Sequence, residues 1–95
     1  MRDYELVAIV SPELDEDGVS QIVERVTQSI SSRGGEVEEV KKWGKRKLAY
    51  PISKFMEADY VLARFRLTPK AIKELEAEIG GLGDVLRYLV VKTDE

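Results

Sequence analysis

Lysine and arginine side chains are concentrated in one short segment of the chain, between residues 41 and 54. This segment contains six basic residues and no acidic residue, although the whole chain carries a formal net charge of −3. Residues 1–40 contain three basic and ten acidic residues, and residues 55–95 contain six and eight. Two aromatic residues, Trp43 and Tyr50, lie within the basic segment. Cations beside aromatic rings suit a polyanion with stackable bases, so RNA binding is the first hypothesis.

The basic segment also has structural interpretations. Its charges could form a solvated surface that binds nothing. Trp43 could cap the hydrophobic core beneath a strand edge instead of stacking on an unpaired base. Tyr50 stands directly before Pro51, which favours an ordered turn, so its ring could serve the fold instead of a ligand.

Catalytic chemistry has little support in this sequence. The chain contains no histidine and no cysteine, so the usual general base, covalent nucleophile and transition-metal ligands are missing. The acidic run at residues 15–17 begins a predicted helix, where carboxylates favour the positive end of the helix dipole; a metal or acid–base role is the minor alternative. The glycine-rich run at residues 80–83 follows a helix, whereas a phosphate-binding loop precedes one. We expect no enzymatic activity, no cofactor, no metal and no small-molecule substrate.

Length and composition indicate one ordered domain over residues 1–95. The chain has 43% apolar and 35% charged residues, which is typical of a globular protein. No apolar run approaches the roughly 20 residues that cross a bilayer. Charges at Arg2, Asp3 and Glu5 argue against a signal peptide, and the missing cysteines fit a reducing compartment. We expect a cytoplasmic protein with no membrane partner.

Hydrophobic periodicity predicts strands at residues 4–10, 36–43, 59–67 and 85–91, and helices at residues 15–33 and from Pro69 to about residue 80. Arg33 is placed in the last turn of the first helix, and Thr68 is placed as the N-cap of the second. Val37 and Val40 are out of phase for a strand, which predicts a bulge or a change of face. Residues 41–54 are expected to run beyond the sheet as a strand extension or a loop.

The order strand–helix–strand–strand–helix–strand matches the ferredoxin-like arrangement of the α+β class. Right-handed crossovers place both helices on one face of a four-stranded antiparallel sheet. The face toward the helices is expected to carry Leu6, Ala8, Val10, Val61, Phe65, Tyr88 and Val90. The opposite face has no cover from this chain and is expected to carry Val7, Ile9, Tyr60, Leu62, Leu89 and Val91, with Arg64 and Arg87 among them. An apolar surface of several hundred Å² marks a partner-binding site, although monomers also expose scattered apolar residues.

Several motifs together resemble the bacterial ribosomal protein S6 family of the small ribosomal subunit. The most specific is Trp43-Gly44-Lys45-Arg46-Lys47-Leu48-Ala49-Tyr50-Pro51-Ile52-x-Lys54. Others are Met1-Arg2-x-Tyr4-Glu5, Ala58-x-Tyr60-Val61-Leu62, Ile72-x-x-Leu75-Glu76 and Asp84-Val85-Leu86-Arg87-Tyr88-x-Val90-Val91-Lys92. The resemblance extends over nearly the whole chain.

The resemblance implies a ferredoxin-like, non-enzymatic ribosomal protein without a cofactor. It also implies a heterodimer with ribosomal protein S18 that binds the central domain of 16S ribosomal RNA and supports assembly of the platform and translation. The expected RNA-binding residues are Arg2, Trp43, Lys45, Arg46, Lys47, Tyr50, Lys54 and Arg87. The expected partner-binding residues are Val7, Ile9, Tyr60, Leu62, Arg64 and Leu89. Many family members have a longer C-terminal tail, so a tail-mediated contact is in doubt for a chain that stops at Glu95.

The main alternative is a small regulatory or ligand-binding domain of the same fold, with a metabolite or a second copy on the open sheet face. The acid-free run at residues 41–54 argues against it, because a neutral ligand needs no such charge. An RNA-recognition module of the other common sheet type is also disfavoured. Its aromatic signature is absent from the first and third predicted strands.

Overall fold

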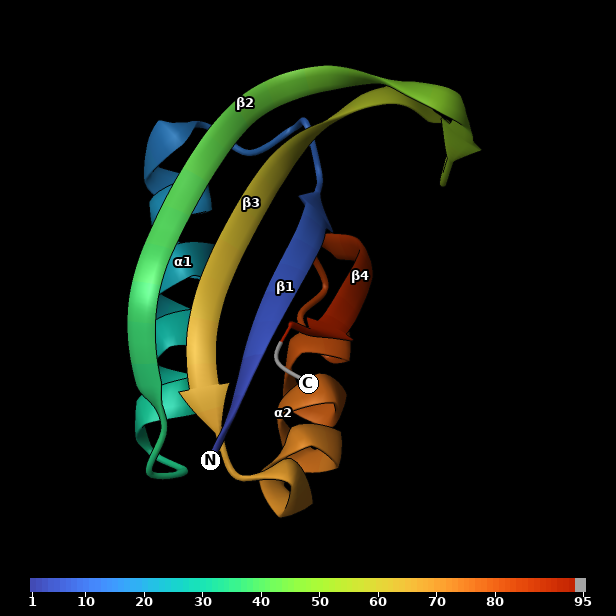
Figure 1. Cartoon of the computed structure of the whole chain (residues 1–95). Helices are drawn as coiled ribbons and strands as arrows, with labels where there is room; N and C mark the ends of the chain where they lie inside the picture. The colour runs from blue at the N-terminus through green and yellow to red at the C-terminus, as the bar shows by residue number, and fades with distance from the viewer. Residues whose placement is uncertain (94–95) are drawn as a thin grey trace.

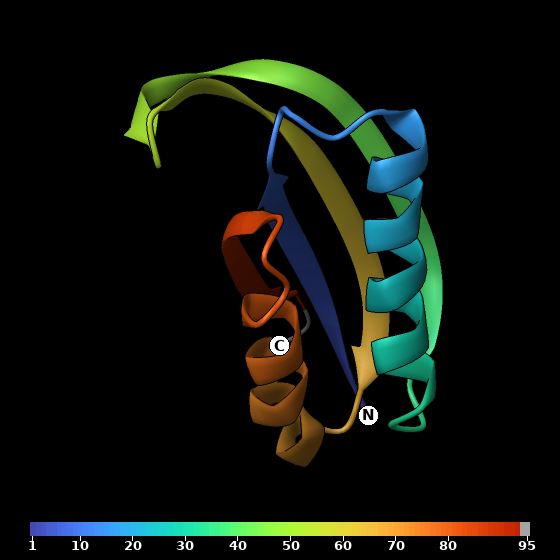
Figure 2. The ribbon, with the colours of Figure 1, turned by 180° about the vertical axis from the view of Figure 1, so that it is seen from behind.

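The computed structural model describes residues 1–93, which fold as a four-stranded sheet backed by two helices (Figure 1). The elements are β1 (Arg2–Val10), α1 (Glu16–Ser31), β2 (Glu36–Ile52), β3 (Phe55–Leu67), a 3₁₀ turn (Pro69–Ala71), α2 (Ile72–Gly80) and β4 (Val85–Lys92). The strand order is β2-β3-β1-β4, and every neighbouring pair is antiparallel. Figure 2 shows both helices on the same side of the sheet. The ferredoxin-like α+β fold expected from the sequence is confirmed.

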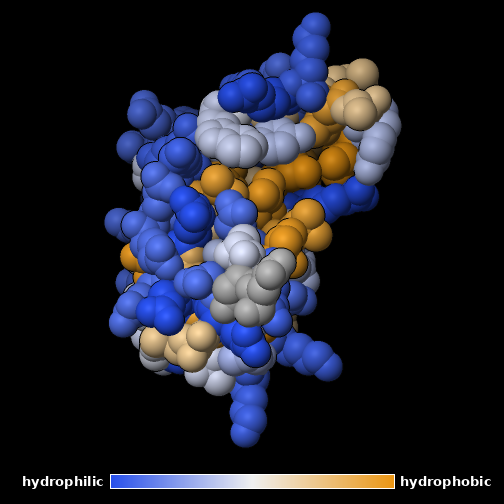
Figure 3. Space-filling view, in the orientation of Figure 1, coloured by the Kyte–Doolittle hydropathy of each residue, from blue (hydrophilic) through white to orange (hydrophobic). Residues whose placement is uncertain are grey.

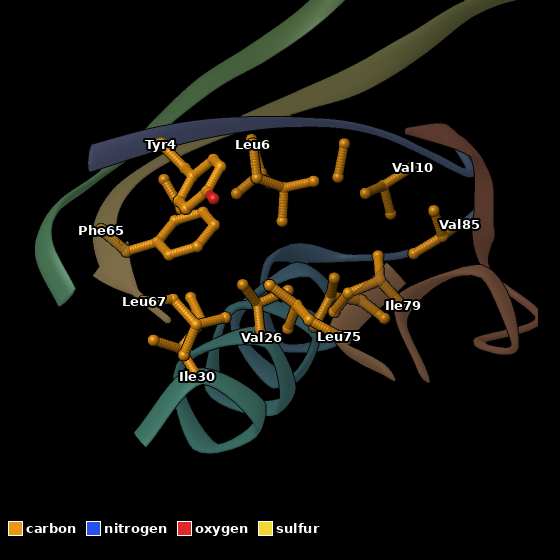
Figure 4. Close-up of a cluster of buried hydrophobic side chains, with 14 of the residues drawn as sticks. Tyr4, Leu6, Val10, Val26, Ile30, Phe65, Leu67, Leu75, Ile79 and Val85 are labelled. Atoms are coloured by element: carbon orange, nitrogen blue, oxygen red, sulfur yellow. The ribbon is translucent and has the colours of Figure 1, made fainter. Parts of the chain in front are cut away.

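The hydrophobic core lies between the sheet and the helices. Strand residues that point toward the helices alternate with residues that point away, and Leu6 pairs with Ala63 while Ala8 pairs with Val61. Val26 and Ile30 of α1 meet them, with Leu75 and Ile79 of α2 beside them (Figure 4). Alternate residues of a pleated strand share one face, so one stripe from each helix is enough to close the core. The largest of the fully buried side chains are Leu6, Val10, Val26, Ile30, Val61, Phe65, Leu67, Leu75 and Ile79.

The ends of α1 are fixed by side chains and by close packing. The Oδ1 atom of Asp15 accepts a hydrogen bond from the Gly18 amide at 2.8 Å, which confirms the structural role predicted for this acidic start. The helix ends at Ser31, so the placement of Arg33 in its last turn was wrong. The chain must turn earlier because Gly35 packs against β3, where an added Cβ would lie 2.6 Å from the carbonyl oxygen of Arg66.

The second helix begins later than the sequence predicts. Thr68 precedes a 3₁₀ turn, with Pro69 at its first position, and its side chain makes no capping hydrogen bond. The α-helical hydrogen bonding starts only at Ile72, because the proline ring fixes a tight turn that the chain continues as 3₁₀ structure. The helix ends at Gly80, with Gly81 as its C-cap, in agreement with the predicted stop at the glycine run.

The opposite face of the sheet is open. The register places Val7 between Leu62 and Leu89, and Ile9 between Tyr60 and Arg87. In the described part of the chain, neither helix covers these residues (Figures 1 and 2). Apolar atoms gather across the middle of this face, with hydrophilic atoms around them (Figure 3). The predicted division of the sheet into a covered face and an open face is therefore confirmed.

Candidate nucleic-acid interface

The basic segment, residues 41–54, forms the later part of β2 and the turn that follows it, in a long hairpin that extends beyond the rest of the sheet. The β2–β3 ladder continues past the pair Lys45 and Asp59 to the pair Lys47 and Glu57, and it closes at Ile52 and Phe55. In Figure 1 this green and yellow arm curves past the end of β1. The expectation of a strand extension is confirmed. The predicted start of β3 at residue 59 was wrong, because the extended β2 supplies ladder partners for earlier residues of β3.

The hairpin closes through a two-residue turn, Ser53–Lys54. Both residues have positive φ angles, 48° and 75°. A two-residue turn with positive φ at both positions matches the right-handed twist of the two strands that it joins. Lys54 therefore stands at the tip of the arm, where its side chain is exposed.

Basic side chains are exposed along the arm. Lys45, Arg46, Lys47 and Lys54 are all exposed, and among residues 1–93 no carboxylate lies within 4.0 Å of their charged nitrogen atoms. Asp59 and Glu57 are the cross-strand neighbours of Lys45 and Lys47, so they reduce the local field without forming ion pairs.

Nearer the body of the sheet, the lysines have partners within the chain. Lys41 forms an ion pair with Glu39 at 3.8 Å, and the Nζ atom of Lys42 donates a hydrogen bond to the Oγ atom of Ser20. The hydroxyl of Ser20 is neutral, so of these two lysines only Lys41 has its charge compensated by an ion pair; the charge without a carboxylate partner in residues 1–93 lies at Lys42 and along the projecting part, at residues 45–47 and 54.

Trp43 lies on the open face of the sheet. It is the extra residue of a bulge in β2, and Gly44, with a φ of 78°, follows it. Its indole ring stacks on Tyr60, with ring centroids 6.4 Å apart and an interplanar angle of 17°. The guanidinium carbon of Arg46 lies 6.0 Å from the centre of the indole. Since Trp43 is 44% exposed, the alternative that it caps the hydrophobic core was wrong.

Tyr50 and Arg87 contact one another across the open face. The Nη1 atom of Arg87 donates a hydrogen bond to the hydroxyl oxygen of Tyr50 at 2.9 Å. The guanidinium carbon also lies 5.8 Å from the centre of the tyrosine ring. The ordered turn expected at Tyr50 and Pro51 was wrong, because both residues belong to β2 and the turn lies at Ser53–Lys54. The ring of Tyr50 nevertheless contacts the fold through Arg87, and the residue is 58% exposed.

One predicted RNA-binding residue lies far from the others. Arg2 begins β1 and pairs with Leu67, eight positions along β3 from Asp59, the partner of Lys45. At about 3.3 Å per residue this separation is roughly 26 Å along the strand. Arg2 therefore belongs to the opposite end of the sheet from the arm.

The predicted partner-binding residues are brought together. Val7, Leu62 and Leu89 form one row across the open face, and Ile9 and Tyr60 belong to the next row. Arg64 lies at one border of this patch, where its Nη1 atom is 3.8 Å from the Oε1 atom of Glu39.

Sequence reasoning missed three features of this surface. Met56 is 63% exposed near the tip of the arm, and Glu57 faces the basic strand. The stacking of Trp43 on Tyr60 was also not expected. The signal available in the sequence was Tyr60, an aromatic residue expected on the open face. The sequence did not show that a bulge in the neighbouring strand would bring the ring of Trp43 onto it.

The described residues do not form a metal-binding cluster or a membrane-spanning helix. Residues 1–93 contain no group of three or more histidine, cysteine, aspartate or glutamate side chains that could hold a metal ion. None of the described helices is both long enough and apolar enough to pass through a membrane.

The model of the family described as ribosomal protein S6 matches residues 3–92 of the chain. The chain belongs to the ribosomal protein S6 family. Members of this family are structural, non-enzymatic constituents of the small ribosomal subunit, and ribosomal RNA and the ribosome are their partners. The resemblance seen in the sequence is confirmed.

Individual relatives agree with this assignment over all or nearly all of their length. The chain is 44% identical to the small ribosomal subunit protein bS6 of Caldanaerobacter subterraneus subsp. tengcongensis, and the match covers 100% of both chains. It is 40% identical to bS6 of Moorella thermoacetica, with 100% of this chain and 97% of that one covered.

Solved structures also match the fold. The crystal structure of 30S ribosomal protein S6 from Thermotoga maritima has a TM-score of 0.91 and 33% identity, and the match covers 97% of this chain and 87% of that one. The C-terminal domain of the MgtC protein from Mycobacterium tuberculosis has a TM-score of 0.66 and 14% identity, with 98% and 88% covered. That second likeness shows the fold alone.

Proposed function

We propose that this S6 family member binds the central domain of 16S ribosomal RNA together with ribosomal protein S18, and so supports assembly of the platform and translation. In this proposal the projecting arm contacts RNA and the open face of the sheet contacts the protein partner. The observation that carries the proposal is the set of exposed basic side chains on the arm that lack a carboxylate within 4.0 Å in residues 1–93.

Phosphate contacts would supply most of the affinity of the arm. Lys45, Arg46, Lys47 and Lys54 would neutralise about four phosphates, which gives a slope of roughly −3 to −4 in a log–log plot of affinity against salt. Such contacts orient the RNA but read little of its sequence. In the same proposal Arg2 meets RNA or the partner at the other end of the sheet.

Shape and base stacking would supply the preference for one RNA element. Trp43 and Tyr50 expose 44% and 58% of their surface beside the basic residues. An unpaired base can stack on such a ring at the same time as its phosphate meets a neighbouring cation. Arg46 already lies over the indole, so a base that stacks there shares the ring with its guanidinium or displaces it.

The open face would hold the protein partner by apolar burial. Val7, Ile9, Tyr60 and Leu62 are half-buried, whereas Leu89 is 60% exposed. At about 25 cal/mol per Å², burial of a few hundred Å² of apolar surface gives several kcal/mol before the entropy cost of association is subtracted. The pair should therefore bind RNA more tightly than this chain alone.

The test compares two triple variants by the binding of a central-domain RNA fragment, with and without S18. The first variant is Lys45→Ala, Arg46→Ala and Lys47→Ala. The matched control is Lys70→Ala, Lys73→Ala and Arg25→Ala, which removes the same charges from exposed positions on the helix side. We expect the arm variant to lose roughly 100-fold in affinity and about two to three units of salt slope, because three phosphate contacts are removed.

The control variant should bind within about threefold of the unaltered chain, because its charges are remote from the arm. Circular dichroism checks that both variants are folded. Equal losses in the two variants would show that only the net charge matters, and an unaffected arm variant would remove the proposed RNA site.

A further inference from the structure

We propose that Tyr50 and Arg87 are positioning residues whose mutual contact clasps the end of the arm to β4. The clasp holds the basic residues at a fixed place above the open face, so that RNA and the protein partner meet one preformed surface. This inference rests on the proposed function and refines it, because it assigns the hydroxyl of Tyr50 and the guanidinium of Arg87 to each other instead of to an RNA phosphate.

The backbone alone does not fix Tyr50. The ladder between β2 and β3 is interrupted between the pair Lys47 and Glu57 and the pair Ile52 and Phe55. Four residues of β2, numbers 48–51, therefore lie opposite Met56 alone. Pro51 is among them and has no amide hydrogen to donate. The end of the arm thus depends on side-chain contacts for its position.

The other half of the clasp is held firmly. Arg87 belongs to β4 and pairs in register with Ile9 of the central strand β1. From there its guanidinium makes both the 2.9 Å hydrogen bond to the Tyr50 hydroxyl and the contact with the tyrosine ring. A paired strand therefore anchors a residue that lies 37 positions away in the sequence.

A second contact supports the base of the arm at the same level of the sheet. Tyr60, Ile9 and Arg87 form one row across the open face. Trp43 stacks on Tyr60 at one end of this row, and Tyr50 contacts Arg87 at the other. The arm is thus attached at two points of one row, and basic residues 45–47 lie between the two attachments in the sequence. An arm held in place pays less conformational entropy when it binds.

The first experiment needs no RNA. Amide hydrogen exchange at residues 52–57 is measured in Tyr50→Phe, which loses only the hydroxyl, and in Arg87→Met, which loses the whole contact. We expect the exchange rate to rise about threefold in Tyr50→Phe, which loses one exposed hydrogen bond. We expect it to rise about tenfold in Arg87→Met, which loses the same hydrogen bond and the cation–π contact. The double variant should match Arg87→Met alone.

The matched control is Arg64→Met, which makes the same chemical change at an exposed arginine on the same face of the sheet. Exchange at residues 52–57 should not change in this control. Unchanged exchange in Arg87→Met, or equal acceleration in Arg64→Met, would overturn the clasp.

The second experiment separates positioning from a direct phosphate contact. RNA affinity of each variant, paired with S18, is measured over a range of salt concentrations. A clasp predicts affinity three- to tenfold lower in both variants with an unchanged salt slope. A direct contact instead predicts that Arg87→Met lowers the slope by about 0.7 to 0.9 and that Tyr50→Phe has no effect, and this result would overturn the proposal. Absence of RNA binding by the unaltered pair would overturn the proposed function. The clasp would still be tested by the exchange measurement, which needs neither RNA nor S18.

Discussion

The two faces of the sheet are built from similar apolar residues but differ in how deeply these residues are buried. Leu6 of β1 points toward the helices and is 1% exposed, whereas its neighbour in the chain, Val7, points to the open face and is half-buried. Leu89, beside Val7 in the sheet, is 60% exposed. A pleated strand sends alternate side chains to opposite faces, so one short sequence can supply a buried core and an exposed apolar surface at the same time.

The covered face should carry most of the stability. Leu6→Ala should lower the free energy of unfolding by about 3 kcal/mol, because it removes three carbon atoms from a packed site and leaves a cavity. Leu89→Ala makes the same chemical change on the open face and should cost less than about 0.5 kcal/mol. Chemical denaturation of the two variants measures the difference directly.

These two variants form a matched pair, since the residue type, the substitution and the sheet are the same. Comparable losses of stability in both would mean that the open face is part of the folded core in solution. The division of labour between the two faces would then be wrong.

The open face should carry the binding of the protein partner. Leu89→Asp should weaken binding to S18 at least tenfold, because a charge enters an apolar contact. The folding stability of the Leu89→Asp variant should change little, because residue 89 is 60% exposed. Titration of S18 with the variant and with Leu89→Ala gives the two affinities. Unchanged binding in Leu89→Asp would exclude this part of the face from the interface.

A smaller effect on stability is expected at the start of α1. Asp15→Ala removes the side chain that accepts the hydrogen bond of the Gly18 amide and should cost about 1 kcal/mol. Asp17→Ala is the control, because it removes an equal charge from the first helical turn without removing the cap. Denaturation curves of both variants separate the cap from the dipole effect, and equal losses would assign the effect to charge alone.

The arrangement of the elements could be predicted from the sequence because periodicity and chain order agree. Alternation in β1 and β3 defines the two faces, and the glycines after each helix mark the two stops. Right-handed crossovers then place both helices on one face of a single four-stranded sheet. The positive charge of the arm and the negative charge of the rest of the chain could also be predicted, because charge depends only on residue type.

The shape of the arm could not be predicted, because it depends on features without a strong local signal. Ser53 and Lys54 adopt positive φ angles in a turn that usually takes asparagine and glycine, so the hairpin had no visible closing point. Without that turn the start of β3 was misplaced. The contact of Tyr50 with Arg87 joins residues 37 positions apart, and it follows from the curvature of the arm and not from any spacing.

The smallest expected effect tests whether polar contacts also hold the helix layer on the covered face. The Oε1 atom of Glu78 on α2 accepts hydrogen bonds from the Oγ atom of Ser29 at 2.6 Å and from the Nη1 atom of Arg33 at 2.7 Å. These hydrogen bonds hold the pKa of the Glu78 carboxyl below its ordinary value of 4.5. The hydrogen bond from Ser29 has the largest effect, and the one from Arg33 has the next largest.

A carboxyl group whose pKa is lower in the folded state stabilises the fold above its unfolded pKa. This contribution is therefore complete at neutral pH and is lost as the pH falls below about 4.5 and through the lower folded-state pKa. Glu78→Gln should remove that part of the acid dependence of unfolding, whereas Glu76→Gln on the same helix should leave it in place. Unfolding measured at several pH values between neutrality and about pH 3 compares the two variants. If the acid dependence of Glu78→Gln equals that of the unaltered chain, the contact between the helices adds nothing to stability, and the covered face is held by its apolar side chains alone.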